Sequence, residues 1–198
     1  MKPEISRCKW AGTDPVYVKY HDKEWGVPIY NDKKLFEFLT LEGAQAGLSW
    51  ITILKRREGY REVFENFDVE RIARFSGSRI DKILKNEKII RNRLKVESTV
   101  KNAKAFMEIQ NEFGSFSKYQ WAFVGGKPIV NHRKTMKSVP ARTKISDEFS
   151  EDLKKRGFSF VGSTIIYAHM QAVGMVNDHT VGCFRYTEVA KKTRRTKS

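Results

Sequence analysis

Two cysteines and two histidines occupy short segments at opposite ends of this 198-residue chain. Cys8 and His21 lie near the start, whereas His179 and Cys183 lie near the end with three residues between them. Two cysteines with two histidines are a common donor set for zinc, and His-x3-Cys can supply two ligands from one turn of chain. If the four side chains meet, a bound metal joins the two ends of the chain and closes a very long loop.

A metal held by all four of these side chains would keep no open position for water. The pattern therefore indicates a structural Zn2+ rather than a catalytic one. The other interpretation of the same residues is two unrelated buried thiols and two hydrogen-bonded histidines, and spacing alone leaves both open.

Aromatic side chains crowd the first quarter of the chain, and one carboxylate lies among apolar neighbours. This carboxylate is Glu42, in the run Leu41-Glu42-Gly43-Ala44-Gln45. Flat rings can enclose a flat ligand, and a carboxylate between apolar residues can accept hydrogen bonds from a base edge or attract a cation. The same rings can belong to the core, and a glutamate can simply be solvated. The aromatic residues are Trp10, Tyr17, Tyr20, Trp25 and Trp50.

The charge balance points to a polyanionic partner. The chain has 38 Lys and Arg against 23 Asp and Glu, a net charge of +15. The last twelve residues carry a net +4, which leaves +11 on the rest of the chain. A surface this positive attracts nucleic acid through its long-range field and through counterion release.

Composition excludes several other classes of protein. With 40% apolar residues and five prolines, the chain can form a packed core and is not disordered as a whole. No apolar run approaches the roughly 18 residues that a membrane span needs. The start lacks the apolar region of a signal peptide, and two distant cysteines do not make a disulfide framework. We expect a cytoplasmic monomer with no membrane partner.

The elements that must position these residues are predicted to be helices. Apolar residues recur at helical spacing along most of the chain, so the predicted fold class is all-α, with a short hairpin at 123–130 beside the turn Gly125-Gly126-Lys127-Pro128. We expect one domain of two packed lobes over 1–186 and a flexible basic tail over 187–198. The expected helix caps are Asp32, Ser146 and Ser163, and the expected helix ends are Gly114, Gly157 and Gly174.

Several long motifs extend through residues 6–185. They are Cys8-Lys9-Trp10, Asp14 to Tyr17, Tyr20 to Pro28, Leu41 to Ile51, Ile89 to Arg93, Lys154 to Gly162 and Val176 to Cys183. Together they resemble the 3-methyladenine DNA glycosylase I family. The resemblance implies an all-α helix-hairpin-helix glycosylase that excises 3-methyladenine from alkylated double-stranded DNA. It also implies that Cys8, His21, His179 and Cys183 bind a structural zinc.

The resemblance also assigns roles around a base pocket. Glu42 and Tyr20 would contact the polar edge of the flipped base, and Trp10, Tyr17 and Trp50 would form its aromatic walls. Glu42 is the predicted catalytic residue, because its carboxylate favours a cationic adenine over a neutral one. Specificity is its first expected role and catalysis its second.

DNA binding is expected at a hairpin around residues 85–95, where basic side chains surround Ile89 and Ile90. No glycine occurs between Gly77 and Gly114, although glycine is common at this turn in the wider superfamily. Leu48 is a candidate wedge that fills the gap left by the flipped nucleotide, or else a core residue. The expected DNA contacts are Leu48, Lys85, Lys88, Arg91, Arg93 and Lys95.

Two observations concern the chemistry. Many helix-hairpin-helix glycosylases place a catalytic Asp downstream of the hairpin, yet no Asp occurs between Lys82 and Ser146, which agrees with this family. Lys127 can be considered as a Schiff-base nucleophile, but its surroundings favour a plain turn lysine. A non-catalytic binder of alkylated DNA and a zinc hydrolase are the alternative functions.

Overall fold

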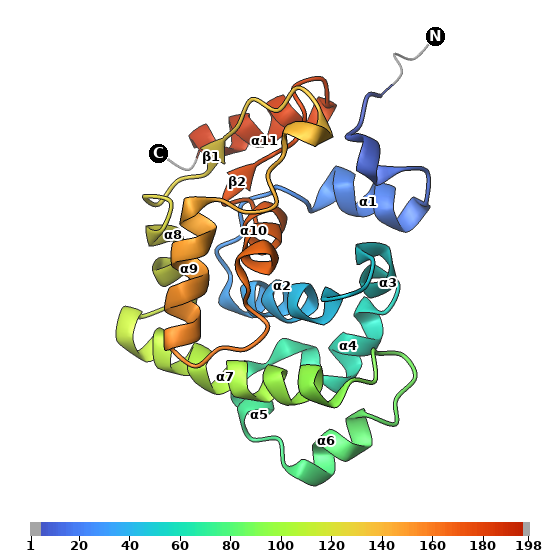
Figure 1. Ribbon diagram of the computed structural model, residues 1–198, viewed down its shortest axis with the longest axis vertical. Coiled ribbons are helices and arrows are strands. Elements are labelled where there is room, and N and C mark those ends of the chain that lie inside the picture. The colour runs from blue at the N-terminus through green and yellow to red at the C-terminus, as the bar shows by residue number, and fades with distance from the viewer. Residues whose placement is uncertain (1–4, 196–198) are drawn as a thin grey trace.

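The computed structural model describes residues 5–195, and it is built almost entirely of helices (Figure 1). Within this range no helix is both long and apolar enough to cross a bilayer. The α-helices are α1 (Pro15–Lys23), α2 (Asp32–Gln45), α3 (Trp50–Leu54), α4 (Arg57–Val63), α5 (Val69–Ala73), α6 (Gly77–Ile83), α7 (Arg93–Phe113), α8 (Phe116–Ala122), α9 (Lys144–Lys155), α10 (Ser163–Ala172) and α11 (Phe184–Arg195). The 3-10 helices are η1 (Lys9–Ala11), η2 (Glu65–Phe67) and η3 (Met136–Ser138), and the strands are β1 (Ile129–Val130) and β2 (Val176–Asn177).

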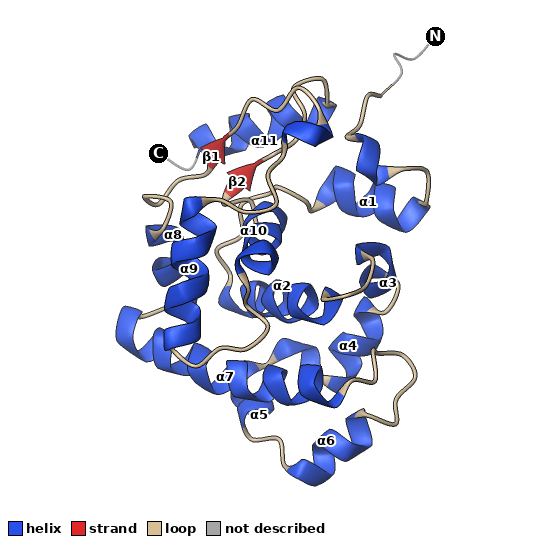
Figure 2. Cartoon of the chain, in the orientation of Figure 1, coloured by secondary structure: helices blue, strands red, loops and turns tan. Residues whose placement is uncertain are grey.

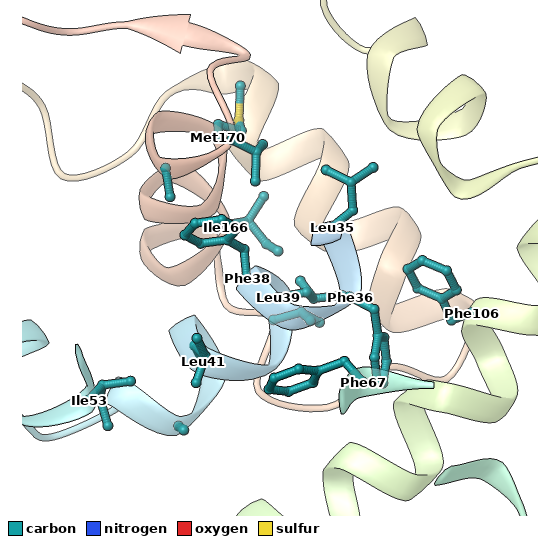
Figure 3. Packing of buried hydrophobic residues seen from close by; sticks show 14 of the residues in the cluster. Leu35, Phe36, Phe38, Leu39, Leu41, Ile53, Phe67, Phe106, Ile166 and Met170 are labelled. Atoms are coloured by element: carbon teal, nitrogen blue, oxygen red, sulfur yellow. The ribbon is translucent and has the colours of Figure 1, made fainter. Parts of the chain in front are cut away.

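Helix α2 lies at the centre of the molecule, between α10 and α7 (Figure 1). Its residues from Leu35 to Ala44 are all buried, so it is covered on nearly every face, as the central helix of a core is. Phe36 packs edge to face on Phe106 of α7, with ring centroids 5.1 Å apart. Leu35, Phe38 and Leu39 lie among side chains of the neighbouring helices (Figure 3). The end of this buried helix carries Glu42.

Some expected helix caps shift by one or a few residues. Asn31, not Asp32, caps α2 through a 3.0 Å hydrogen bond from the Lys34 amide. The Asp32 carboxylate instead accepts the amides of Phe116 and Ser117 at the start of α8, at 2.9 and 2.8 Å. Its side chain therefore stabilises the beginning of a different helix.

The other two predicted caps are displaced in the same way. Thr143 caps α9, and Ser146 is the third residue of the helix in a reciprocal capping box. Gly162 precedes α10, while Ser163 is its first residue and contacts the Ser146 hydroxyl at 2.9 Å. The predicted end at Gly114 is confirmed, since Gly114 caps α7 in the left-handed region with φ 79°.

The hairpin expected at 123–130 is wrong. The Gly-Gly-Lys-Pro turn ends the α8 segment, and β1 then pairs in parallel with the distant strand β2, with Ile129 opposite Val176 (Figure 2). The partner of β1 therefore lies more than 40 residues further along the chain, after α10. Local sequence cannot reveal such a pairing.

The N-terminal segment contacts the start of the last helix. The Phe184 amide donates to the Ser6 carbonyl at 3.0 Å, so α11 begins beside the N-terminal segment. Residues 187–195, expected in a flexible tail, continue α11, and Val189 is buried. Residues 196–198 of that expected tail lie outside the described part of the chain.

Candidate active site and metal cluster

One short helix carries side chains of both predicted sites. Asp14 caps α1 by accepting the Val16 amide at 2.9 Å, and Pro15 occupies the first helical position, where its missing N–H costs nothing. Tyr17, Tyr20 and His21 then follow at a spacing of three and four residues, which places them on adjoining faces. The two tyrosines line a cavity, and His21 joins the cysteines.

The predicted metal ligands come together as a buried cluster. The donor atoms of Cys8, His21, His179 and Cys183 all lie within 4.8 Å of one another. The Cys183 Sγ lies 3.4 Å from His21 Nε2 and 3.6 Å from His179 Nδ1, and the Cys8 Sγ lies 3.6 Å from His179 Nδ1. Tetrahedral zinc with ordinary Zn–S and Zn–N bonds separates sulfur from nitrogen by roughly 3.6 Å. The distances therefore fit a tetrahedral metal ion.

The second nitrogen of each histidine is held by an oxygen. His21 Nδ1 lies 2.8 Å from the Asp22 carboxylate, and His179 Nε2 lies 3.1 Å from the Trp25 carbonyl. When these N–H groups donate to the oxygens, the other ring nitrogens, His21 Nε2 and His179 Nδ1, each carry a lone pair toward the cysteines. Metal-bound histidines need such a lone pair. The donor set and its orientation can thus hold a metal ion.

The predicted aromatic residues enclose a cavity of about 210 Å³. Its volume lies below the range of drug-sized ligand sites, which suits a single flat base. Trp10 packs on Tyr17 with ring centroids 5.1 Å apart, and Tyr20 packs on Trp50 at 5.5 Å. The side chains that line it are Trp10, Tyr17, Tyr20, Trp25, Glu42, Gln45, Trp50, Met136, Val139, Ala168 and Gln171.

Glu42 lies in this cavity with only 4% of its surface exposed. Among the described residues, no hydrogen bond to its carboxylate is seen, and burial raises its pKa from an ordinary 4.5 to about 8. Burial also raises the pKa of the Tyr20 hydroxyl, and the neighbouring Glu42 adds to the effect. The cavity is therefore a desolvated site in which a carboxylate lacks a positive partner.

Three donors around the cavity are also unsatisfied. The indole N–H groups of Trp10 and Trp50 and the hydroxyl of Tyr20 are buried without a hydrogen-bond partner. Orphaned buried donors are costly in a folded protein and mark places where a ligand completes the hydrogen bonding.

Comparison with known proteins identifies the family of this chain. The profile of the methyladenine glycosylase family matches residues 10–186. The chain belongs to this family. It is 49% identical to the DNA-3-methyladenine glycosylase of Haemophilus influenzae, with 90% of this chain and 96% of that protein covered. It is 46% identical to DNA-3-methyladenine glycosylase 1 of Escherichia coli, with 92% and 97% covered.

Solved structures of relatives share the fold. A crystal structure of 3-methyladenine DNA glycosylase I superposes with a TM-score of 0.89 at 47% identity, covering 90% of this chain and 98% of that one. A structure of the Staphylococcus aureus enzyme, which concerns its recognition of 3-methyladenine, gives a TM-score of 0.88 at 36% identity, with 90% and 95% covered.

The glycosylase cavity contains residues that sequence reasoning did not assign to it. Met136 and Val139 come from the segment after β1, whereas Ala168 and Gln171 come from α10. Ala168 and Gln171 are three residues apart on one helix, but nothing in their sequence distinguishes them from core positions. Trp25 was noted among the aromatic residues without a role, and it packs on Trp10 at 4.9 Å.

The segment 84–92 joins α6 and α7 at the end of this glycosylase that is remote from α1 and α11 (Figure 1). Lys85 is exposed and has no ion pair in the described part of the chain. Exposed ion pairs link Lys88 to Glu62, Arg91 to Glu87, and Arg93 to Asp81 and Glu97. Such exposed pairs are weak, so these cations stay available to phosphates.

Lys95 lies differently from the other predicted DNA contacts. Its Nζ donates to the carbonyls of Ala44 and Ala46 at 2.8 and 2.6 Å, where it satisfies the last carbonyls of α2. The chain turns at Gly47, whose φ is 78°, and the next residue, Leu48, is 39% exposed. Lys95 therefore supports the turn that presents Leu48.

A close approach between Gly59 of α4 and Lys88 fixes the position of the 84–92 segment. A Cβ at Gly59 would lie 2.5 Å from the Lys88 carbonyl oxygen. We predict that Gly59→Ala displaces this segment, costs about 1–3 kcal/mol of stability and weakens DNA binding. Urea unfolding and a DNA-binding titration measure both effects.

Gly77→Ala is the matched control, because a Cβ there would meet nothing within 4 Å. Its stability should change by less than about 0.5 kcal/mol. Equal DNA affinities for the two variants would contradict a role of the Gly59 contact in DNA binding.

The burial of Glu42 predicts a pH-dependent stability. Its folded pKa of about 8 lies above the ordinary 4.5, so the folded protein keeps a proton that the unfolded chain loses between these values. We compare the free energy of unfolding of the wild type with that of Glu42→Gln. Below pH 4.5 the wild type keeps its full stability, and between pH 4.5 and 8 it loses up to about 5 kcal/mol relative to the variant. Urea unfolding of both proteins at about pH 5 and about pH 8.5 tests this. An unchanged difference between them would contradict it.

Proposed function

We propose that this chain is a monofunctional DNA glycosylase that hydrolyses the glycosidic bond of 3-methyladenine in alkylated DNA and so initiates base excision repair. The observation that carries the proposal is Glu42, which is buried in a cavity walled by aromatic rings and has no cationic partner in the part of the chain that the structure describes. Such a cavity favours a flat ligand that is itself positively charged. The names of the relatives, which are 3-methyladenine glycosylases, support the same substrate.

The substrate brings much of the chemistry with it. In DNA, 3-methyladenine carries a positive charge, which weakens its glycosidic bond and makes the base a good leaving group. The protein must therefore unstack the nucleotide, hold the base and stabilise an oxocarbenium-like sugar until water attacks. No covalent intermediate on the protein is required, and Lys127 is an exposed turn residue.

Glu42 acts through its charge. A cationic base in the cavity favours the ionised carboxylate, so binding converts the buried, protonated acid into the partner of a positive ring. A neutral adenine offers no such compensation. Glu42 thus selects the damaged base first and stabilises developing positive charge on the sugar second.

The remaining cavity residues place the base. Trp10, Tyr17 and Trp50 supply the aromatic walls, and the Tyr20 hydroxyl, which stays protonated, donates to the polar edge of the ring. The unpartnered indole and hydroxyl donors support these assignments.

We assign DNA binding to a helix-hairpin-helix formed by α6, the 84–92 segment and α7. Its cations, Lys85, Lys88, Arg91 and Arg93, neutralise phosphates without reading sequence. Leu48 fills the gap left by the flipped nucleotide. Lys95 contributes by holding the turn of Leu48.

We assign Zn2+ as the metal of the Cys8, His21, His179 and Cys183 cluster. Two thiolates with two imidazoles are a donor set that zinc prefers, and four protein ligands suit a structural ion. When bound, zinc supplies folding stability by joining the chain ends. The two cysteines form no disulfide, in keeping with a cytoplasmic protein. We expect the protein to act as a monomer.

Release of free bases from methylated duplex DNA, resolved by chromatography, tests the proposed function. We expect release of 3-methyladenine with little 7-methylguanine. A folded, metal-loaded protein that binds methylated DNA but releases no base would overturn the enzyme and leave a damaged-DNA binder.

A further inference from the structure

Asp178, beside the metal ligand His179, has no exposed surface and accepts four hydrogen bonds. Its Oδ1 accepts from Asn131 Nδ2 at 2.8 Å and Arg133 Nε at 3.1 Å. Its Oδ2 accepts from the Tyr167 hydroxyl at 2.6 Å and Gln171 Nε2 at 2.9 Å. The carboxylate is thus saturated with donors, and Arg133 balances its charge.

Two of these donors connect Asp178 to the base cavity. Gln171 lines the cavity directly. Arg133 also donates through Nη1 to the carbonyl of Ser138 at 3.1 Å, at the end of η3, which carries the lining residue Met136. Asp178 therefore holds two parts of the cavity lining: Gln171 directly, and the η3 segment through Arg133.

The carboxylate also decides which way the Gln171 amide points. A carboxylate can only accept hydrogen bonds, so Nε2 must face Asp178, and the carbonyl oxygen Oε1 must occupy the other position. No hydrogen bond to this Oε1 is seen from the described part of the chain. Because Gln171 lines the cavity, this oxygen is an unused acceptor at the cavity wall.

We propose that Gln171 is a specificity-determining residue that accepts a hydrogen bond from the exocyclic amine of the adenine ring, and that Asp178 is the residue that positions it. This inference rests on the proposed function. The amine carries two N–H donors, so Glu42 and Gln171 can each accept one. A guanine ring carries an oxygen at the same carbon, and this oxygen would face the Gln171 acceptor with no donor between them. The cavity thus separates methylated adenine from methylated guanine by unpaired acceptors as well as by shape.

The test is the preference between two free bases, 3-methyladenine and 3-methylguanine, titrated against the metal-loaded protein by tryptophan fluorescence. Gln171→Met keeps the length of the side chain and removes the acceptor. We expect its affinity for 3-methyladenine to fall about tenfold while that for 3-methylguanine stays the same or improves. Excision of the two bases from methylated DNA should show the same change in ratio.

Asp178→Asn is the second variant. Its amide can offer an N–H toward Gln171, which allows the Gln171 amide to turn its NH2 into the cavity, so the preference for adenine should again fall about tenfold. Gln110→Met is the matched control, because Gln110 Nε2 makes the same kind of bond to Asp32, at 2.7 Å, away from the base cavity. Its base preference should equal that of the wild type.

A Gln171→Met protein whose base preference stays within about twofold of the wild type would overturn the inference. Wild-type protein that neither binds nor excises 3-methyladenine would instead overturn the proposed function. The two failures are therefore distinguishable in one set of titrations.

Discussion

Replacing Glu42 with Gln is expected to lower kcat/KM for 3-methyladenine excision by about a hundredfold. The variant keeps the shape of the side chain but removes the carboxylate that, among the described residues, alone lines the cavity. A preorganised charge in a desolvated site typically contributes two to three orders of magnitude to the rate, because no water screens it. Single-turnover release of 3-methyladenine from methylated DNA measures the effect.

Two further variants make this result specific. Glu148→Gln removes an exposed carboxylate on α9 and should excise at the wild-type rate. Glu42→Asp keeps the charge on a shorter side chain and should restore part of the lost rate. A Glu42→Gln protein that is folded, metal-loaded and within about threefold of wild type would contradict the electrostatic role.

Cys183→Ser is expected to lower the Tm by about 10 °C or more. The variant removes one of the four side chains of the buried cluster that we propose as the metal ligands between the N- and C-terminal segments. Loss of a structural metal removes its binding free energy from the folded state. For a chain of this size, each kcal/mol corresponds to roughly 2–4 °C, so a loss of about 3–5 kcal/mol suffices. Thermal unfolding with metal analysis measures both quantities together.

The wild type should contain one zinc per chain, and a strong chelator should lower its Tm toward that of Cys183→Ser. His132→Asn is the control, because His132 is exposed and lies outside the cluster. Stoichiometric zinc in Cys183→Ser, or a chelator that leaves the wild-type Tm unchanged, would show that the four residues are not the metal site.

The residues with unusual chemistry were predictable from the sequence. All five residues expected around the base line one cavity, and the four expected metal ligands form one cluster. The grouping of these residues was predictable because the residue types themselves limit the chemistry: paired thiols and imidazoles suit few functions other than metal binding, and long motifs fix their neighbours. Their roles as metal ligands and base contacts stay predictions.

Contacts between distant segments were not predictable. Asp32 looks like the cap of its own helix, yet it accepts the first amides of α8, which begins 84 residues along the chain. Lys95 looks like one more phosphate contact in a basic run, yet it donates to two carbonyls at the end of α2. Ile129 and Val130 find their strand partner in β2. In each case the deciding partner is supplied by tertiary packing, which local sequence does not record.

The burial of the two thiols has a consequence for the conditions in which this protein works. Methylating agents attack sulfur nucleophiles as well as DNA bases, and a thiolate at the surface is an easy target. Cys8 and Cys183 are only 1% and 3% exposed, and Trp10 and Trp25 pack on the two histidines of the same cluster. The protein thereby shields its own most reactive atoms from the reagents whose damage it removes.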